Sequence, residues 1–363
     1  GIIRAKVIEV KPNVKAKIEN SGTLSSRKGV NFPNTVINIE VITKKDEADI
    51  AWGVKNRVDY FAISFVQNAK DMRRARELLG DYKGKLIAKI EKFDAVSNID
   101  EIIEVSDGIM VARGDLGIEV PYYDVPTIQK MLIKKSNAKG IPVITATQML
   151  LSMTQNERAT RAEISDVANA VLDGTDIVML SEESAVGENP VNVVETMHNI
   201  IKQTEKIFDH EKRYKFTYLD EFDVIQATVT KLADDLSADG ILSLTSSGNS
   251  ARKMSRYRPI TPLYTFAHDK ETLTGLTALW GVQPITTVKE AQASKMIQRM
   301  LRSLEKREIL NKKGLYICTV GYPVGIPGST NTIKILTPSE IEFYLNFKEN
   351  REKIKTEKKV NLA

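Results

Sequence analysis

The chain has 363 residues, of which 42% are hydrophobic and 27% charged, a composition typical of a globular protein and not of a disordered one. Its length exceeds what one compact core usually supports, so we expect two domains. The net charge of +5 comes from 52 basic and 47 acidic residues, and no basic block is interleaved with aromatic residues. This charge pattern argues against nucleic-acid binding and suits small anionic substrates.

The single cysteine, Cys318, lies in the apolar run GLYICTV, where we expect a buried, unreactive thiol. It can form no disulfide within the chain, which suits a reducing, cytoplasmic location. No apolar stretch reaches the roughly 20 residues that a membrane span needs. No signal peptide is expected at the start of the chain, and no membrane partner.

The N-terminal segment alternates apolar and polar side chains around the turn signals KPN and NSG, which predicts short antiparallel strands. Thr43, with Asp46 three residues later, predicts the N-terminus of a helix. Apolar runs then alternate with amphipathic segments: we predict strands at 59–65, 86–91, 107–112, 142–147 and 176–181, and helices near 68–80, 94–105, 125–139, 160–173 and 190–207. This alternation predicts a parallel sheet, either doubly wound or part of an eight-stranded barrel.

A second α/β pattern follows a candidate linker at 208–222. The predicted elements are a helix near 222–237, a strand at 240–248, a helix at 250–258, a strand at 262–268, a helix ending near Trp280, a strand at 282–287, a further helix, and strands at 314–320 and 332–336. The tail at 347–363 is charged throughout, and we expect a frayed or solvated helix there.

Polar residues follow the predicted strands of the first pattern, at the end where parallel α/β proteins carry their functional sites. They are Ser64, Lys89, Glu91, Arg113, Gly114, Asp115, Thr147, Gln148, Ser181, Glu182 and Glu183. Glu91 and Asp115 are oxygen ligands of the kind Mg²⁺ takes when a protein supplies only one or two carboxylates, although both could be solvated acids. Lys89 shares a strand face with Glu91. It could stabilise a transferring phosphoryl group or an enolate, or form a salt bridge to Glu91.

Three further features of this edge have less specific interpretations. The backbone N–H groups of Gly114 and Asp115 would face an anion such as a carboxylate, although Gly-Asp is also an ordinary turn. Thr147 and Ser181 could bind substrate or relay a proton. The helical run 160–174 carries polar residues on one face, including Arg161, Glu163 and Asp166, and we interpret it as solvated or facing another subunit.

The second α/β pattern has one informative loop, which comprises Thr245, Ser246, Ser247, Gly248, Asn249 and Ser250. It follows a strand and begins a helix, where hydroxyls, a glycine and free N–H groups form a phosphate nest. An ordinary Ser/Thr-rich helix cap is the alternative. No acid, histidine or metal ligand lies beside the loop in the sequence, so binding is favoured over catalysis. The loop at 321–330 could fold over it.

Six stretches together resemble the pyruvate kinase family, in that family's order and spacing. They are SSRKGVNFP, AKIEKFDAVSNIDEI, SDGIMVARGDLGIEVP, PVITATQML, TRAEISDVANAVLDGTDIVMLSEESAVGENP and GYPVGIPGSTNTIKI. The resemblance implies a (β/α)₈ barrel of the TIM type, a small inserted β-domain, and a C-terminal α/β domain that holds effectors. It divides the chain into 1–32, a remnant of the β-domain; 33–208, the last five strands of the barrel; 209–345, the effector domain; and 346–363, the tail.

The resemblance also implies an activity: transfer of phosphate from phosphoenolpyruvate to ADP, giving pyruvate and ATP, with Mg²⁺ and usually K⁺. The implied enzyme is a cytoplasmic homotetramer controlled by a phosphorylated effector on residues 245–250. Matched by motif, Lys89 resembles the lysine that stabilises the transition state, Glu91 and Asp115 resemble the Mg²⁺ ligands, and Gly114 and Thr147 resemble groups that hold phosphoenolpyruvate. Ser181 resembles a serine in the proton path to the enolate, and Ser64 a serine near the lysine and the nucleotide.

The chain departs from the family pattern in three places. Glu182 stands where many relatives have glycine, and the loop at 321–330 lacks arginine and lysine, so a nucleoside monophosphate or another sugar phosphate fits as well as fructose bisphosphate. The chain begins inside what resembles the inserted β-domain. Counterparts of the first three barrel strands, with the substrate arginine and the K⁺ ligands, are therefore missing. Because five strands cannot close an eight-stranded barrel, we expect either a longer native protein or an inactive chain.

Two other hypotheses stay open at this point. One is a related barrel enzyme that acts on phosphoenolpyruvate or pyruvate by carbon–carbon chemistry, such as an aldolase or a mutase, which would also place Glu and Asp on Mg²⁺. The other is a non-catalytic module for effector binding or assembly. Dependence on ADP separates the first from a kinase, and binding without turnover would identify the second.

Overall fold

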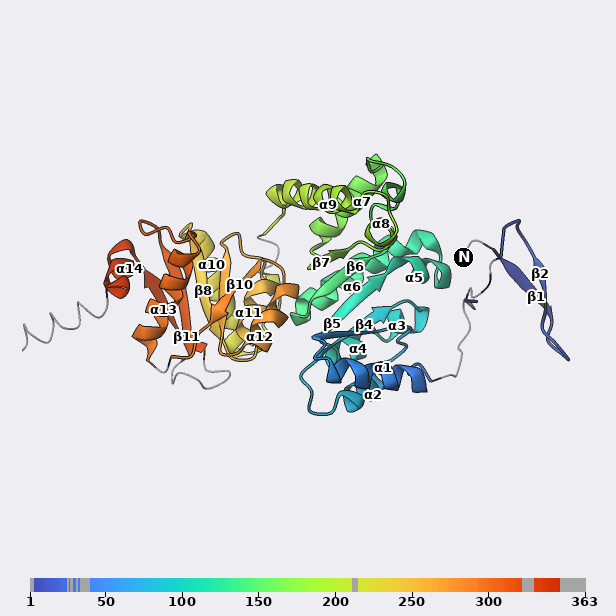
Figure 1. The fold of residues 1–363 in the computed structure, drawn as a ribbon, viewed down its shortest axis with the longest axis horizontal. Helices are drawn as coiled ribbons and strands as arrows, with labels where there is room; N and C mark the ends of the chain where they lie inside the picture. The colour runs from blue at the N-terminus through green and yellow to red at the C-terminus, as the bar shows by residue number, and fades with distance from the viewer. Residues whose placement is uncertain are drawn as a thin grey trace, which may run out of the picture.

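The computed structural model describes residues 3–24, 26, 29–30, 32, 40–210, 215–290, 292–321 and 330–346. These residues form two five-stranded sheets and a separate two-stranded hairpin (Figure 1). The charged tail at 347–363 and the middle of the loop at 321–330 lie outside the described residues. In the described part of the chain, no helix combines the length and the apolar character that crossing a bilayer requires.

The hairpin consists of β1 (Ala5–Glu9) and β2 (Lys15–Ile18), which pair antiparallel with Ala5 opposite Ile18. Every residue of both strands is exposed, and a register shift between Val7 and Glu9 marks a bulge. The antiparallel pair predicted around KPN is therefore confirmed. The segment after NSG forms no strand among the described residues up to position 24.

The first sheet is all-parallel and follows the order β3-β4-β5-β6-β7. Its strands are β3 (Tyr60–Ile63), β4 (Lys85–Ile90), β5 (Gly108–Ala112), β6 (Val143–Ala146) and β7 (Ile177–Met179), so the five predicted strands are confirmed. Right-handed crossovers that never reverse direction put every connecting helix on the same face. A doubly wound sheet would reverse and cover both faces. The strand order therefore supports the barrel type of winding.

The helices of this half begin with α1 (Lys44–Lys55), where Asp46 N donates to the Thr43 hydroxyl and the Asp46 carboxylate accepts from Thr43 N, as the sequence predicts. The others are α2 (Ala69–Leu79), α3 (Phe93–Ser97), α4 (Ile99–Val105), α5 (Arg113–Glu119), α6 (Val125–Lys139), α7 (Arg161–Asp173), α8 (Glu182–Ala185) and α9 (Pro190–Thr204). The single helix predicted at 94–105 is thus two helices that meet at Asn98. The short helices α5 and α8 follow strand ends directly and carry no periodic apolar pattern that would have predicted them.

The two faces of the first sheet have different partners. Leu86, Ala88 and Ile90 of β4 belong to a large buried cluster with the helices. Ile87, between them in sequence, belongs to a smaller cluster on the opposite face, with Met110 of β5 and residues of β6. Because side chains alternate along a strand, Lys89 and Glu91 project on this second face.

The second sheet follows the order β10-β9-β8-β11-β12, with β12 antiparallel to β11 and the other pairs parallel. Its strands are β8 (Gly240–Thr245), β9 (Leu263–Ala267), β10 (Val282–Thr287), β11 (Tyr316–Gly321) and β12 (Thr330–Leu336). Its helices are α10 (Glu221–Asp235), α11 (Asn249–Arg256), α12 (Lys270–Gly275), α13 (Ala293–Lys306) and α14 (Pro338–Leu345). The order reverses at β8 and β11, so this sheet is doubly wound, with a buried cluster on each face.

Two details of the second sheet bear on the sequence predictions. Cys318 is fully buried in β11, and burial raises the pKa of its thiol to about 12, so the expected unreactive cysteine is confirmed. Helix α14 was not predicted, although Thr337, Pro338 and Glu340 supply a complete start signal.

A buried ion pair joins the two halves of the molecule. Arg258, which follows α11 and is 1% exposed, donates to Asp176 Oδ1 at 2.7 Å. It also donates to Asn137 Oδ1 at 2.8 Å and to the Gly174 carbonyl at 2.9 Å. Asp176 directly precedes β7 and accepts from the backbone N–H of Trp280 at 3.2 Å. The geometry of the domain junction is therefore fixed by buried polar contacts that cross it.

Replacing Arg258 with alanine would leave Asp176 buried without its cation. We expect the free energy of unfolding to fall by about 3–5 kcal/mol, measured by urea denaturation. The matched control is Lys231→Ala, which removes an exposed ion pair with Asp235, where both side chains are 59% exposed. The control should change stability by less than about 0.5 kcal/mol. Similar small losses in both variants would contradict the role of Arg258.

Candidate active site

The strands of the first sheet are in register, so the residues that follow them lie along one edge. The paired positions nearest this edge are Ile63 with Ala88, Ile90 with Val111, Ala112 with Ala146, and Ala146 with Met179. The polar residues predicted at the strand ends are thus brought to one side of the sheet. Their side chains form three separate groups of contacts.

The first group joins the ends of β3 and β4 around Lys89. The Lys89 ammonium lies 2.6 Å from Glu91 Oε1 and donates to Ser64 Oγ at 2.7 Å. Glu91 Oε2 accepts from the backbone N–H of Phe65 at 2.6 Å. Glu91 is 1% exposed, whereas the Lys89 side chain is 24% exposed. The salt bridge that the sequence offered as an alternative is present, and it balances the charge of a buried carboxylate.

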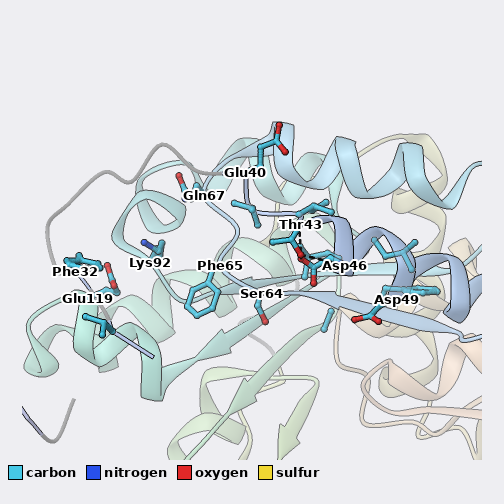
Figure 2. A pocket seen from close by; sticks show the side chains of 17 residues that line it. Phe32, Glu40, Thr43, Asp46, Asp49, Ser64, Phe65, Gln67, Lys92 and Glu119 are labelled. Carbon is cyan, nitrogen blue, oxygen red and sulfur yellow. Dashed lines mark hydrogen bonds between the residues drawn. The ribbon is translucent and has the colours of Figure 1, made fainter. Parts of the chain in front are cut away.

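A cavity of about 620 Å³ opens beside the end of β3. In Figure 2, Ser64 and Phe65 lie between Lys92 and Glu119 on one side and Asp46 on the other. Glu119, at the end of α5, is 6% exposed, and burial raises the pKa of its carboxyl. Lys92 opposes this shift. No sequence pattern singled out Glu119, because the raised pKa of its carboxyl depends on burial in the folded chain.

The second group joins the ends of β5 and β6. The Gly114 N–H donates to Thr147 Oγ1 at 2.8 Å, and the Thr147 hydroxyl donates to the Ala146 carbonyl at 2.7 Å. The Gly114 N–H that was predicted to face an anion is thus occupied by the Thr147 hydroxyl. Asp115, in the first turn of α5, has no hydrogen-bond or ion-pair partner among the residues that the structure describes.

Arg113 holds this second group in place. Its guanidinium lies 2.6 Å from Asp166 Oδ2 in α7 and donates to the Thr147 carbonyl at 2.8 Å and the Ala146 carbonyl at 3.3 Å. Interpreting the polar face of α7 as merely solvated or subunit-facing was therefore wrong for Asp166. The pairing could not be read from the sequence, because Arg113 and Asp166 are far apart in the chain and meet only when β5 and α7 are assembled.

Backbone strain is concentrated at this edge. Phe65, Thr147 and Gln148 have φ values of 55°, 69° and 54°, and they are three of the seven non-glycine residues with positive φ in the described chain. Threonine is β-branched, so this conformation is a genuine outlier for Thr147. Strained residues persist where surrounding contacts hold them, and they cluster at functional sites. Here the bond from Arg113 to the Thr147 carbonyl supplies such a contact.

The third group joins the ends of β6 and β7. Glu183 is fully buried, and its carboxylate accepts from the backbone N–H of Ser181 at 2.7 Å and of Leu150 at 3.1 Å. Ser181 is half-buried, and its hydroxyl has no partner among the described residues. Glu182, the departure from the family pattern, is exposed. Glu183 was named in the sequence only as a strand-end acid, and its positioning of Ser181 was missed.

The carboxylates of this edge suit a metal held mainly by other ligands. Among the described residues there is no group of three or more His, Cys, Asp or Glu side chains arranged to hold a metal ion. Glu91 and Asp115 supply two carboxylates, and Mg²⁺ commonly takes one or two from a protein and completes its shell with water and substrate. Asp115 is free to bind, and each Glu91 oxygen keeps a lone pair beyond its present hydrogen bond. The pair therefore fits Mg²⁺ by donor type.

The loop at 245–250 lies where the second sheet reverses direction. Ligands of α/β sheets bind at such switch points, beyond the carboxyl ends of the strands. Gly248 is the N-cap residue of α11 and has a φ of +84°, and its N–H donates to the buried Thr245 hydroxyl at 2.9 Å. A cavity beside the loop is also lined by Asp269 and Glu271. The expectation that no acid lies beside this loop holds for the sequence and is wrong for the folded chain.

Comparison with known proteins identifies relatives over most of the chain. Residues 1–194 match the family model described as "Pyruvate kinase, barrel domain", and residues 223–336 match "Pyruvate kinase, alpha/beta domain". The chain is 41% identical over 351 residues to a pyruvate kinase of Bacillus licheniformis, which covers 94% of this chain and 60% of that protein. It is 42% identical over 329 residues to one of Geobacillus stearothermophilus, covering 89% and 56%. It is 41% identical over 330 residues to one of Clostridium acetobutylicum, covering 89% and 70%. The chain thus spans little more than half of the first two relatives.

The raised pKa of Glu119 predicts a pH-dependent effect of Glu119→Gln. Because the folded state binds this proton more tightly than the unfolded chain, its stabilising contribution is present at low pH and is lost as pH rises through the folded-state pKa. At pH 7 the charged, buried carboxylate therefore destabilises the folded state, and replacing it with glutamine removes this destabilisation. We expect Glu119→Gln to raise the free energy of unfolding at pH 7 and to match the wild type below about pH 4. Urea denaturation across this range tests it, and an offset independent of pH would contradict it.

Proposed function

Because this chain belongs to the pyruvate kinase family, we propose that it catalyses the magnesium-dependent transfer of phosphate from phosphoenolpyruvate to ADP, giving pyruvate and ATP. The observation that carries this proposal is the contact of Lys89 with Ser64 and Glu91 at the ends of β3 and β4. It puts a partly exposed cation beside a buried carboxylate at the edge where parallel α/β proteins carry their sites. The reaction is downhill because the released enol becomes a ketone. The protein therefore has to position the substrates, neutralise their charge and deliver a proton.

Lys89 would stabilise charge on the transferring phosphoryl group. An ammonium has three N–H donors, and here Ser64 and Glu91 take two of them, which leaves one for a phosphate oxygen. Ser64 and Glu91 also restrict the long lysine side chain, so less conformational freedom is lost when the substrate binds. Preorganised charge of this kind accelerates a reaction when it interacts more strongly with the transition state than with the substrate.

Glu91 and Asp115 would hold Mg²⁺, which when bound supplies charge neutralisation for phosphate and enolate oxygens. The buried Glu91 is anchored by Lys89 and by Phe65 N–H, whereas Asp115 is unpartnered among the described residues. The Glu91 carboxylate would thus be held in place before the metal binds, and the Asp115 carboxylate would move to coordinate the ion. The family usually also requires K⁺, and we assign none of the described residues to it.

Gly114 and Thr147 would bind the carboxylate end of phosphoenolpyruvate. The Thr147 hydroxyl now accepts from Gly114 N–H, as a substrate carboxylate oxygen would. A substrate that takes this N–H would release Thr147 Oγ1 as a second polar contact. Arg113 keeps the Thr147 backbone in its strained conformation, so the hydroxyl stays aimed at the end of β5.

Ser181 would belong to the path that delivers a proton to the enolate carbon. Its backbone N–H is held by the buried Glu183, and its hydroxyl has no competing partner among the described residues. A hydroxyl can accept one proton while donating another, so a serine is suited to relay rather than to store a proton. Glu183 would act as a positioning residue for Ser181.

Regulation is proposed at the loop 245–250, which would bind a phosphorylated effector such as a nucleoside monophosphate or a sugar phosphate. The support is its place at the switch point of the second sheet and the N-terminus of α11 behind it. A cytoplasmic homotetramer is part of the same proposal and rests on the family alone.

Replacing Lys89 with alanine should lower kcat by about 10²–10³-fold, with a much smaller change in KM for phosphoenolpyruvate, because the lost charge acts mainly in the transition state. A coupled assay of pyruvate formation from phosphoenolpyruvate, ADP and Mg²⁺ measures both constants. The matched control is Lys139→Ala, which removes an exposed lysine of α6 paired with Glu104 and should keep wild-type kinetics.

Three outcomes of the same assay would contradict the proposed activity. Consumption of phosphoenolpyruvate that does not depend on ADP would favour the aldolase or mutase alternative. Absence of turnover by the folded wild-type chain would favour a non-catalytic module. Equal turnover by Lys89→Ala and the wild type would remove Lys89 from the mechanism.

A further inference from the structure

The segment that follows β6 begins with the strained residue Thr147 and continues into a 3₁₀ turn at Leu151–Thr154. Its middle is buried, since Met149 and Leu150 are both 0% exposed. Strained residues persist only where surrounding contacts hold them. The contacts that hold residues 146–152 therefore determine where the Thr147 hydroxyl lies.

Two charged side chains hold the first part of this segment. Arg113 of α5 donates to the Thr147 carbonyl at 2.8 Å. The buried Glu183 of α8 accepts from the backbone N–H of Leu150 at 3.1 Å. Both contacts lie before the 3₁₀ turn, so they leave the end of the segment to be fixed by another element.

Glu163 of α7 holds that end. Its carboxylate accepts from the Ser152 N–H at 2.7 Å and from the Ser152 hydroxyl at 2.5 Å. The same carboxylate accepts from the Thr160 N–H and hydroxyl, both at 2.8 Å, as part of the capping box that begins α7. One side chain thus binds both the N-terminus of α7 and the 3₁₀ turn. Interpreting Glu163 as merely solvated or subunit-facing was therefore wrong, as it was for Asp166.

The acidity of Glu163 reflects these hydrogen bonds. Burial by itself would raise the pKa of its carboxyl, but the hydrogen bonds from Ser152 and Thr160 together outweigh burial and lower the pKa below its ordinary value. The carboxylate is therefore charged at neutral pH. Hydrogen bonds to a charged acceptor are stronger than those between neutral groups, so the contact with Ser152 is suited to fixing the turn.

A second carboxylate of α7 acts on the other end of the segment. Asp166 lies 2.6 Å from the Arg113 guanidinium, which in turn holds the Thr147 carbonyl. Residues three positions apart on a helix share a face, so Glu163 and Asp166 approach the segment from the same side of α7. The helix thereby sets the separation between the two ends of the segment, through Arg113 at the start and directly at Ser152.

We propose that Glu163 is a positioning residue for phosphoenolpyruvate, because through Ser152 it fixes the segment that presents the Thr147 hydroxyl to the Gly114 N–H. The identity of the substrate rests on the proposed function, whereas the geometry of the segment does not. Thr147 and Gly114 would hold the carboxylate end of the substrate equally before and during phosphoryl transfer. A loosened segment should therefore raise KM for phosphoenolpyruvate and leave kcat and KM for ADP nearly unchanged.

Ser152→Ala and Thr160→Ala separate the two contacts of Glu163, since each removes one hydroxyl that donates to the same carboxylate oxygen. We expect both variants to lower the urea midpoint by similar amounts, because each loses one hydrogen bond. Only Ser152→Ala should raise KM for phosphoenolpyruvate, by about 3- to 10-fold, the effect of weakening one hydrogen bond. Glu163→Gln should raise it at least as much, and Ser152→Ala still serves if Glu163→Gln fails to fold. Equal KM values in Ser152→Ala and Thr160→Ala would overturn the proposal.

Amide hydrogen exchange gives a readout that does not depend on turnover. In Ser152→Ala the amides of residues 148–152 should exchange about 5- to 10-fold faster than in the wild type, whereas in Thr160→Ala the faster exchange should be confined to the first turn of α7. If the wild type neither binds nor turns over phosphoenolpyruvate, the proposed function fails and the exchange rates alone decide whether Glu163 positions the segment. Unchanged exchange at 148–152 in Ser152→Ala would overturn that role.

Discussion

Right-handed crossovers carry the chain from β3 to β7 without a reversal, so all the carboxyl ends of the strands reach one edge of the first sheet and all the amino ends reach the other. The alternation of side chains then divides β4 between two environments. Its apolar residues at 86, 88 and 90 pack under the helices, and Lys89 and Glu91 project on the other face. The same strand begins with Lys85, which lines a cavity between the two domains. One direction of winding therefore puts the candidate catalytic residues and the wall of the interdomain cavity at opposite edges of the sheet.

Buried charged side chains connect different helices and strands of this molecule through ion pairs and hydrogen bonds. Burying an ion is costly unless it is paired or hydrogen-bonded, and several buried ions of this molecule bind groups on other elements. Glu91 binds the N–H at the end of β3, Glu183 links the ends of β6 and β7, and Arg258 reaches from the second domain to Asp176 of the first. Glu119, which is 6% exposed, is an exception, since its carboxyl group has no hydrogen-bond or ion-pair partner among the described residues.

Local sequence patterns predicted the helices and strands, whereas the contacts between their side chains depend on how the folded chain assembles them. The parallel strands followed from apolar runs, and α1 from the spacing of Thr43 and Asp46. The break at Asn98 was missed because the apolar period continues through it. The pairing of Arg113 with Asp166 was also missed, because it joins residues that only the folded sheet brings together. Strand order, which separated a barrel type of winding from a doubly wound sheet, depends on pairing that the sequence does not encode locally. The roles assigned to the site residues stay predictions.

The β1–β2 hairpin has a consequence for solubility. Each of its strands has an edge that pairs with no other strand in the described chain, and Val7 and Ile8 are 47% and 65% exposed. Open edges of this kind invite pairing with a second molecule, and natural proteins oppose it with lysines and bulges. Both devices are present here, as the bulge after Val7 and as Lys6, Lys15 and Lys17 on the strands. Repulsion between these lysines is screened at high ionic strength, where the Debye length falls to about 3 Å at 1 M salt. Salt that leaves the two sheets folded would thus promote self-association through the hairpin.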